Sequence, residues 1–566
     1  MHIPIKSLLI GMLACSAMVA CSNEDVLESN EQENQKAGNS YLAVKLVSPS
    51  ADSRALGAYA DGNANEQAVT NARFYLFKSN GEAYTITDES GNTKNFVDAT
   101  SFEDEGVVSP NVETILSTVL VIDKSQVAPP AKILAVLNYP TTILKDESKS
   151  LSQLQDILDN FGTINDESNG APYTTSGKFV MSNSAYVDAA GNIVYATPIA
   201  AENIKTDPED AHAAPVKIYV ERVAAKVQTQ VDAAQTKPTG KEQTFFVKDG
   251  EYYAFTGQID AEDKPIYAHL KGWRVTNITS KSKLIKSLET TAEANYAWIW
   301  NNPTYYRSYW ADDANENLSW AWNFNETNRS FADTDNDDNW EYYNENTKNE
   351  EGENSQLLVA AEFVTFNGET PSKPQPIAEW YGVKYTLNNL KTHIAGALAD
   401  KLFTYDEEND KFISITGDAI TFTQVSSTEE SGRYISKIGV VEGTYFYKSN
   451  DTMKQYGAEG NTQLSTVINA LQPAKIWGNI VNGDYVGGGY YYVDIEHETT
   501  EEGTIYGLVR NHWYLLTLKN LNGLGTPVYN PEEVIITEKP DTDYSYISAE
   551  INVLSWRMVS QNVNLQ

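Results

Sequence analysis

The chain has 566 residues and a formal charge of −35, and it contains 11 Trp, 34 Tyr and 17 Phe. This length allows two or three domains with full cores, and the aromatic content favours strands. The acidic balance excludes a basic surface that neutralises phosphates, so we expect neither nucleic-acid binding nor binding to an anionic membrane surface.

The N-terminus has the pattern of an export signal. Lys6 precedes the apolar run SLLIGMLACSAMVA, and a polar, acidic stretch follows. The run is too short to span a bilayer permanently, which indicates a signal peptide over residues 1–20. The three residues before Cys21 resemble a bacterial lipobox, so we predict lipidation of Cys21 and an anchor in the outer membrane. Cys15 is the competing site, but it would leave a shorter apolar core.

Residues 22–40 are rich in Asn, Glu, Ser and Gln and are predicted to form a flexible tether. The next segment, Tyr41 to Pro49, alternates apolar and other side chains, with Leu42, Val44 and Leu46 in phase. This period of two predicts a strand.

A single arginine, Arg54, stands in the small, polar stretch after this strand. Such a stretch is accessible to a trypsin-like protease, so the bond between Arg54 and Ala55 is a candidate maturation cut. The alternative is an ordinary arginine in a loop. Residues 21–54 are accordingly predicted to be a propeptide.

From Ala55 onward, strand and turn signals dominate the sequence. In the first half we predict strands over 72–82, with a turn at Asn80–Gly81, over 131–140 and over 216–231. Residues 149–162 have a helical period, with Gly162 as the stop and one apolar face made of Leu151, Leu154, Ile157, Leu158 and Phe161. The proline-bearing segment before residue 216 indicates a change of domain, giving predicted domains over 55–227 and 228–537.

The second predicted domain shows four further strand segments, over 272–285, 354–368, 487–497 and 507–525. A short helix is predicted from Thr462 to Leu471. Residues 310–356 are rich in Asp, Asn and aromatic residues and are predicted to be a long surface excursion.

Three aspartates in this excursion, Asp333, Asp335 and Asp337, have the odd spacing of a calcium loop. However, Asp338 stands where such a loop needs glycine, and Asn344 stands where it needs a bidentate glutamate. A solvated loop is therefore the preferred interpretation. We predict no metal site and no cofactor.

The last residues again follow a period of two, after a polar linker that begins at residue 538. The in-phase residues are Ile547, Ala549, Ile551, Val553, Val559, Val563 and Leu565, and Trp556 interrupts the alternation. A strand at the end of a chain can join its own sheet or be passed to a neighbouring molecule. The sequence does not decide between these two alternatives. It also does not show on which face of the strand Trp556 lies.

Three of these segments together resemble the fimbrillins of Bacteroidales, in particular the Mfa1-like family of minor-fimbria shaft subunits. They are VERVAAKV at 220–227, RNHWYLLTLKNLNGLG at 510–525 and INVLSWRMVSQNVNL at 551–565. The resemblance implies two transthyretin-like β-sandwich domains with a few short helices, a propeptide strand that carries Leu42, Val44 and Leu46, and a C-terminal donor strand within 538–566.

The resemblance also implies how such a subunit would act. A lipoprotein precursor would be cut at Arg54, and the C-terminal strand of the next subunit would replace the lost strand, which gives a head-to-tail homopolymer at the cell surface. Expected partners are other copies of the chain, accessory anchor and tip subunits, and glycans or proteins on host or bacterial surfaces.

Two other classes of function compete with the fimbrial one. Residues 295–313 contain a cluster of Trp and Tyr that could bind glycans, as in a surface glycan-binding lipoprotein or tip adhesin that does not polymerise. An enzyme is the third class. None of the six histidines has a ligand spacing, and with 77 acidic residues a pair of carboxylates carries no information. We therefore predict no catalytic residues.

Overall fold

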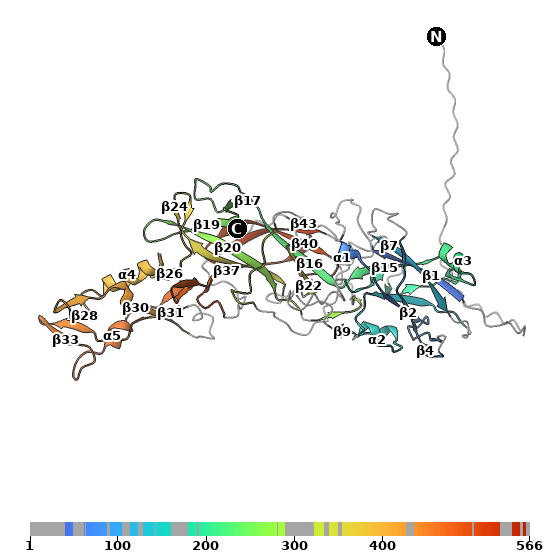
Figure 1. Cartoon of the computed structure of the whole chain (residues 1–566), viewed down its shortest axis with the longest axis horizontal. Helices are drawn as coiled ribbons and strands as arrows, with labels where there is room; N and C mark the ends of the chain where they lie inside the picture. Colours follow the sequence, from blue (N-terminus) through green and yellow to red (C-terminus); the bar gives the residue numbers. More distant parts are fainter. Residues whose placement is uncertain are drawn as a thin grey trace, which may run out of the picture.

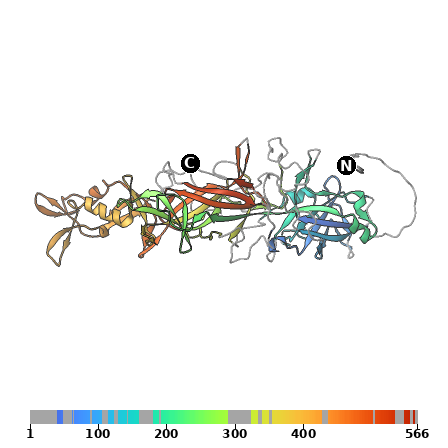
Figure 2. The ribbon, with the colours of Figure 1, turned by 90° about the horizontal axis from the view of Figure 1, so that it is seen from above.

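The computed structural model describes residues 40–48, 62, 64–87, 91–104, 114–122, 128–141, 143–159, 179–188, 192–279, 281–288, 322–332, 339–348, 354–425, 435–500, 503–532, 546–554 and 559–561. These residues lie mostly in strands, with a few short helices, which confirms the predicted mainly β class. The strands form an elongated molecule (Figures 1 and 2). Among the described residues, no helix is both long and apolar enough to cross a bilayer.

The N-terminal unit is built on a ten-stranded sheet at one end of the molecule (Figure 1). Its main path runs in the order β5-β2-β8-β10-β15-β1-β7-β6, with β13 beside β8 and β14 beside β1. The strands are β1 (Ser40–Ser48), β2 (Ala72–Phe77), β5 (Phe96–Ala99), β6 (Glu103–Asp104), β7 (Thr114–Ile122), β8 (Lys132–Leu137), β10 (Met181–Asn183), β13 (Thr197–Pro198), β14 (Ile204–Lys205) and β15 (Val216–Arg222).

Both faces of this sheet are covered in its middle. In β2, Phe74 and Leu76 belong to one apolar cluster, while Tyr75 and Phe77 belong to another. All six residues of β2 are buried, which explains why its sequence is almost continuously apolar instead of alternating. The predicted turn at Asn80–Gly81 follows β2, and Gly81 adopts the positive φ of 86° that such turns favour.

The central unit is a pair of sheets that face each other. The first runs in the order β22-β16-β40-β42-β43, and the second in the order β17-β18-β19-β20-β23-β37-β41. A single apolar cluster joins them, with Val227 and Leu516 from the first sheet and Trp273 and Val359 from the second. The bounds are β16 (Ala224–Val231), β17 (Ala233–Ala234), β18 (Phe245–Lys248), β19 (Glu251–Ile259), β20 (Pro265–Thr276), β22 (Trp340–Asn344), β23 (Gln356–Val364), β37 (Gly488–Asp494), β40 (Trp513–Asn522), β41 (Thr526–Val528), β42 (Tyr546–Leu554) and β43 (Val559–Gln561).

A third unit, the inserted unit, covers residues 377–477 and lies at the end of the molecule away from the N-terminal unit (Figure 1). It leaves the central unit after β23 and returns before β37, and these two strands pair directly with each other. It has a separate apolar cluster, to which Leu390, Ile394 and Ile476 belong. The predicted range 228–537 therefore contains the core of the inserted unit in addition to that of the central unit.

The inserted unit contains two sheets and two helices. The sheets run in the orders β27-β26-β34-β31-β30 and β29-β28-β32-β33. The elements are β26 (Ile377–Trp380), β27 (Val383–Thr386), α4 (Leu387–Ala397), β28 (Phe403–Asp406), β29 (Lys411–Ser414), β30 (Ile420–Gln424), β31 (Ile435–Val440), β32 (Phe446–Ser449), β33 (Thr452–Gln455), α5 (Leu464–Ile468) and β34 (Ala474–Trp477). Helix α5 lies inside the predicted range 462–471.

The remaining described elements are short. Those of the N-terminal unit are α1 (Ala64–Gln67), β3 (Ile86–Thr87), β4 (Thr93–Lys94), α2 (Leu151–Gln155), β9 (Leu158–Asp159), β11 (Tyr186–Val187), β12 (Ile193–Val194) and α3 (Pro208–Ala213). Those that follow are β21 (Ser282–Lys283), β24 (Phe366–Asn367), β25 (Thr370–Pro371), β35 (Asn479–Val481), β36 (Asp484–Val486), β38 (Glu496–Thr500) and β39 (Gly503–Tyr506).

The predicted helix over 149–162 is wrong in its extent. It begins as expected, with a capping box in which Ser150 and Gln153 exchange hydrogen bonds, but α2 ends at Gln155. Leu158, placed on the helical face by its spacing, lies instead in β9, which pairs with β21. Phe161 and Gly162 lie outside the described residues.

The strand predicted over 216–231 is divided in two. Val223 separates β15, in the sheet of the N-terminal unit, from β16, in the central unit. The chain therefore changes sheet a few residues before the predicted domain boundary at 227. Apolar residues alternate on both sides of the break, but the phase shifts from Val216, Ile218 and Val220 to Val223, Ala225 and Val227.

Candidate functional site

Strand β1 lies inside the sheet of the N-terminal unit, between β15 and β7 (Figure 1). It pairs antiparallel with β7 along its full length, from Ser40 opposite Ile122 to Ser48 opposite Thr114. On its other side it pairs parallel with β15, from Val44 opposite Val216, and antiparallel with β14. The predicted propeptide strand is thus paired on both of its edges.

The side chains of β1 that the structure describes are buried. Leu42, Ala43 and Val44 are all 0% exposed. Leu42 and Val44 belong to the same apolar cluster as Leu120 of β7 and Ile218 of β15. Burying a leucine or valine side chain stabilises a fold by about 1.5–3 kcal/mol, so β1 contributes to the core as well as to the hydrogen-bonded ladder.

Strand β42 is the terminal strand that the sequence predicted, and it joins the sheet of its own chain. It pairs antiparallel with β40, from Trp513 opposite Leu554 to Asn522 opposite Tyr546, with a shift of register between Leu518 and Asn520. The much shorter β43 folds back along part of its other edge. Of the two alternatives for the terminal strand, the structure shows the intramolecular one.

The register of β42 places its in-phase residues opposite buried residues of β40. Ile551 is opposite Leu516, and Val553 is opposite Tyr514. Both partners are 0% exposed and belong to the core of the central unit. The alternation in the sequence is therefore matched to an apolar row on the neighbouring strand.

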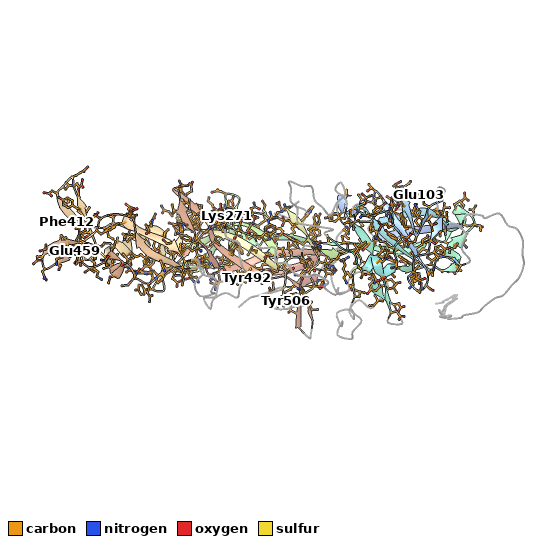
Figure 3. All side chains as sticks on the ribbon, turned by 90° about the horizontal axis from the view of Figure 1, so that it is seen from below. Glu103, Lys271, Phe412, Glu459, Tyr492 and Tyr506 are labelled. Carbon is orange, nitrogen blue, oxygen red and sulfur yellow. The ribbon has the colours of Figure 1, made fainter. Side chains whose placement is uncertain are left out.

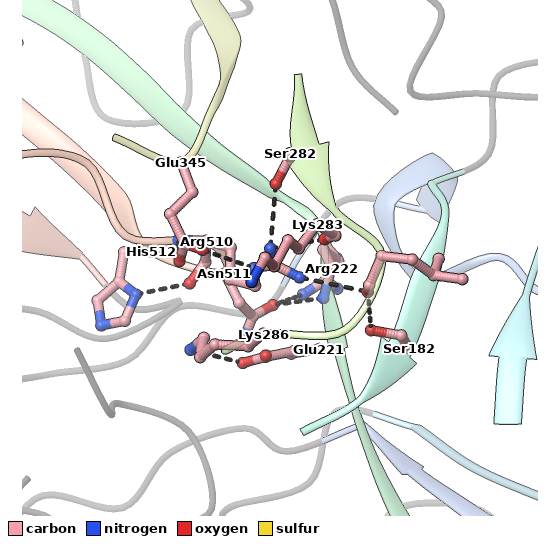
Figure 4. Close-up of polar contacts among 11 residues, drawn as sticks. Ser182, Glu221, Arg222, Ser282, Lys283, Lys286, Glu345, Arg510, Asn511 and His512 are labelled. Atoms are coloured by element: carbon pink, nitrogen blue, oxygen red, sulfur yellow. Dashed lines mark hydrogen bonds and ion pairs between the residues drawn. The ribbon is translucent and has the colours of Figure 1, made fainter. Parts of the chain in front are cut away.

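A buried polar cluster lies between the N-terminal and central units, at the start of β40 (Figure 4). Arg510 is 1% exposed, and its Nε lies 3.1 Å from Glu345 Oε1. Its Nη2 donates to Ser282 Oγ at 3.0 Å and to the carbonyl oxygen of Lys283 at 2.8 Å. Because the partners come from distant parts of the chain, Arg510 ties the start of β40 to β21 and to the residue after β22.

Asn511 continues this cluster toward β15. Its φ of 59° lies in the left-handed region, which asparagine tolerates better than most residues. The Oδ1 atom accepts a hydrogen bond from Arg222 Nη1 at 3.1 Å, and the backbone amide donates to the carbonyl oxygen of Ala224 at 2.7 Å. The Arg-Asn pair in the sequence thus fixes the host strand of β42 against the end of the strand that pairs with β1.

A second ion pair lies in the same region. Lys286 Nζ lies 3.0 Å from Glu221 Oε2, and both side chains are almost completely buried. Burial raises the pKa of Glu221, while Lys286 and Arg510 oppose that rise. A buried charge is costly unless it is paired, so the cluster favours one relative position of the two units.

The predicted site residues are only partly within the described chain. Leu42, Val44 and Leu46 lie in β1, and Ile547, Ala549, Ile551 and Val553 lie in β42, with Val559 in β43. Outside the described residues lie Cys21, Arg54, Ala55, Asp333, Asp335, Asp337, Trp556, Val563, Leu565 and the aromatic segment 295–313. Within the described ranges, no group of three or more His, Cys, Asp or Glu residues could hold a metal ion.

Sequence reasoning did not identify β7, one of the two long strands that border β1; the other, β15, lies within the strand predicted over 216–231. The apolar run TILSTVLVI of β7 was available in the sequence as a signal for a buried strand. The pairing of β7 with β1 could not be predicted in this way, because the local sequence of a strand does not determine which strand will be its neighbour.

Comparison with known proteins gives one match to a family model. Residues 484–562 match the model of the C-terminal region of fimbrillin, the major fimbrial subunit protein type IV. This range runs from β36 to β43 and includes β40 and β42. No curated protein sequence matches the chain.

Several solved structures are similar to the chain at low identity. A fimbrilin (FimA) of Porphyromonas gingivalis is 13% identical, with a TM-score of 0.34, over 92% of this chain and 98% of that one. The tip fimbrial protein Mfa3 of P. gingivalis is 9% identical, with a TM-score of 0.27, over 90% and 99%. A fimbrial assembly protein of Parabacteroides distasonis is 12% identical, with a TM-score of 0.29, over 59% and 86%. The family-model match alone makes the part of this chain that carries β40 and β42 similar to the C-terminal region of fimbrillin, the major fimbrial subunit protein type IV.

Proposed function

We propose that this chain is a structural subunit of a cell-surface fimbria, and that it polymerises when proteolysis removes β1 and the C-terminal strand of another copy takes its place. The observation that carries the proposal is the position of β1, in the interior of a sheet but close to the N-terminus of the chain. The match of residues 484–562 to the fimbrillin model supports the same class of protein.

Removal of β1 would create an acceptor for one strand. The facing edges of β7 and β15 would lose their partner, and they would stand about 9.5 Å apart, twice the usual spacing of strands. Unpaired backbone groups and a bare apolar surface are costly in a folded protein. The cut chain would therefore bind an extended apolar segment strongly.

Strand β42 suits this acceptor in length and pattern. Both β1 and β42 have nine residues. In its own sheet β42 has one full-length neighbour, β40, and only the short β43 on its other edge. In the place of β1 it would pair with β7 along its full length and, on the other edge, with β15 and β14 as β1 does, so transfer to another copy would increase its backbone pairing.

The order of segments along the chain suits a single proteolytic trigger. Cys21 precedes β1, and Arg54 follows it. One cut after Arg54 would therefore release both the lipid anchor and the strand that fills the acceptor. The resulting head-to-tail contact does not close on itself, so it would extend into a filament with accessory subunits at its ends.

The test is cut-dependent polymerisation of the purified precursor. An arginine-specific protease should yield a product that begins at Ala55 and forms ladders resistant to heat in detergent. An Arg54→Lys variant should form no ladders with this protease but should form them with trypsin, which also cleaves after lysine. A chain truncated after Thr537 should be cut without forming ladders, because it lacks the donor strand.

Two results would reject the proposal. One is a ladder from the truncated chain, and the other is a correctly cut, folded full-length chain that remains monomeric. Because Arg54→Lys keeps the charge at the site, it separates an effect of cleavage from an effect of the side chain itself.

A further inference from the structure

The sheet β29-β28-β32-β33 of the inserted unit is little covered, and its strand β29 is exposed along its whole length. None of the residues in its four strands is buried. Figure 3 shows Phe412, from β29, at the end of the molecule away from Glu103 of the N-terminal unit. A sheet usually needs a covered apolar face to be stable, so one with so little cover at the end of an elongated molecule indicates a surface that takes a partner.

A row of aromatic rings crosses this sheet. The ring of Phe412 lies 5.1 Å from that of Tyr405 in β28 and 4.9 Å from that of Phe446 in β32. The rings are inclined to each other by 55° and 67°, so they form a ridge rather than a flat platform. Tyr405 is 42% exposed and Phe412 is 37% exposed. Exposed, mutually packed aromatic side chains are typical anchors of protein–protein contacts.

The outer edge of β29 is also open, since no described strand pairs with it. Its residues Lys411 to Ser414 are all exposed, and they include Ile413 at 38% as well as Phe412. The opposite edge of the same sheet, β33, has the sequence TMKQ, in which Met453 is the one apolar residue, and each of the two edge strands carries one lysine, Lys411 in β29 and Lys454 in β33. The two edges therefore differ in their apolar content, and β29 is the one that offers exposed apolar side chains to a pairing segment.

The turn beside this edge is acidic. Asp406 is the last residue of β28, and Glu407, Glu408 and Asp410 lie in the turn to β29. A hydrogen bond from Asn409 and the charge of Lys411, which is opposite Asp406 in register, lower the pKa of Asp406. The Tyr405 hydroxyl donates to Asp410, which holds that carboxylate next to the aromatic row. With a chain charge of −35, a second copy would be repelled from this turn, whereas a basic partner would be attracted.

We infer that the open edge of β29, the aromatic row and the acidic turn form a docking surface for an extended, basic segment of a partner polypeptide, which adds to the sheet as a strand. The three features act on different parts of the partner. Its backbone pairs with β29, its apolar side chains cover the rings of Tyr405 and Phe412, and its lysine or arginine side chains meet the carboxylates of the turn. Because β29 has only four residues, affinity depends on all three.

The probe is a labelled seven-residue peptide of alternating valine and lysine, titrated into the uncleaved full-length protein and followed by fluorescence anisotropy. We expect a Kd on the order of micromolar, which weakens as salt is added. Two control peptides test the mechanism. One has glutamate in place of each lysine, and the other carries N-methylated amides throughout, which removes the backbone donors. Both should bind at least tenfold more weakly.

Matched variants locate the site. Phe412→Lys and Thr452→Lys each add one positive charge at an exposed position, the first on the edge β29 and the second on the edge β33. Phe412→Lys should weaken peptide binding at least tenfold, whereas Thr452→Lys should leave it within about twofold. Ile413→Lys, on the same edge and without a ring contact to lose, should repeat the first result. Melting curves confirm that each variant is folded.

Hydrogen exchange gives an independent reading of the mode of binding. Amides in residues 403–414 should exchange more slowly when the peptide is present, and those in 446–455 should change little. Equal binding of the N-methylated peptide, equal losses from Phe412→Lys and Thr452→Lys, or no binding of the basic peptide would each overturn the inference. So would binding of a neutral oligosaccharide by Tyr405 and Phe412 in the absence of peptide binding. The measurement uses the uncleaved chain, so its outcome does not depend on strand exchange.

Discussion

At the scale of single residues, the buried charges of this chain concentrate where the N-terminal and central units meet. Arg510 contacts Glu345, and Lys286 contacts Glu221, all with side chains at most 7% exposed. Ion pairs on the rest of the surface, such as Lys78 with Glu82, are exposed and add little to stability. The buried pairs have more effect because each member would be costly without its partner.

Replacing Arg510 tests this cost. Arg510→Met removes the cation and leaves Glu345 buried near Glu221, so we expect a loss of about 3–5 kcal/mol of stability and a clear fall in melting temperature. The double variant Arg510→Met with Glu345→Gln should recover a large part of the loss, since no unpaired charge remains. Calorimetry of the three proteins measures both effects. An unchanged melting temperature for Arg510→Met would show that the cluster is not a structural joint.

At the scale of elements, the sequence predicted those strands whose pattern is local. The strands β1, β2, β8, β40 and β42 all coincide, to within one residue at their starts or inside wider bounds, with segments recognised by apolar period and flanking turn residues. One error has a long-range cause. The helix that was expected to continue past Gln155 is replaced by the pairing of β9 with β21, more than a hundred residues away in sequence. Helix α4 was not predicted, although Thr386 caps its first turn.

For the candidate site, too, the sequence predicted the strands but not their neighbours. The sequence identified its two strands, because each alternates over several residues. It did not show that β1 lies between β7 and β15, or that β42 already pairs with β40, since register and neighbour are decided by tertiary packing. The lipidation of Cys21 and the cut at Arg54 stay predictions from sequence.

The strand β1 should stabilise the precursor only. Leu42 is 0% exposed, so Leu42→Ala removes buried contacts and should cost about 2–5 kcal/mol, seen as a lower melting temperature of the N-terminal unit in the uncut chain. If β1 is lost on maturation, polymers formed from this variant should be as resistant to heat in detergent as those of the parent. Polymers weakened by Leu42→Ala would mean that β1 stays in the assembled form.

At the scale of the whole molecule, the inserted unit extends a two-unit body from one end. It departs between β23 and β37, which pair with each other as neighbouring strands do in a hairpin. An insertion at such a connection leaves the pairing of the host intact, because the chain leaves and returns at nearby points. The residues that belong to the host core at this junction are Ile377 and Trp477, and they are opposite each other in register.

This register permits a clean removal of the inserted unit. Replacing Ala378 to Ile476 with Asn-Gly joins Ile377 to Trp477 through a two-residue turn of the type that antiparallel neighbours favour. We expect the shortened chain to fold, to form cut-dependent ladders like the parent, and to lose binding of the valine–lysine peptide, because β29 is absent while β1 and β42 are untouched. Loss of ladders in a folded shortened chain would instead place the inserted unit in the contact between subunits. Retained peptide binding would place the docking surface elsewhere on the molecule.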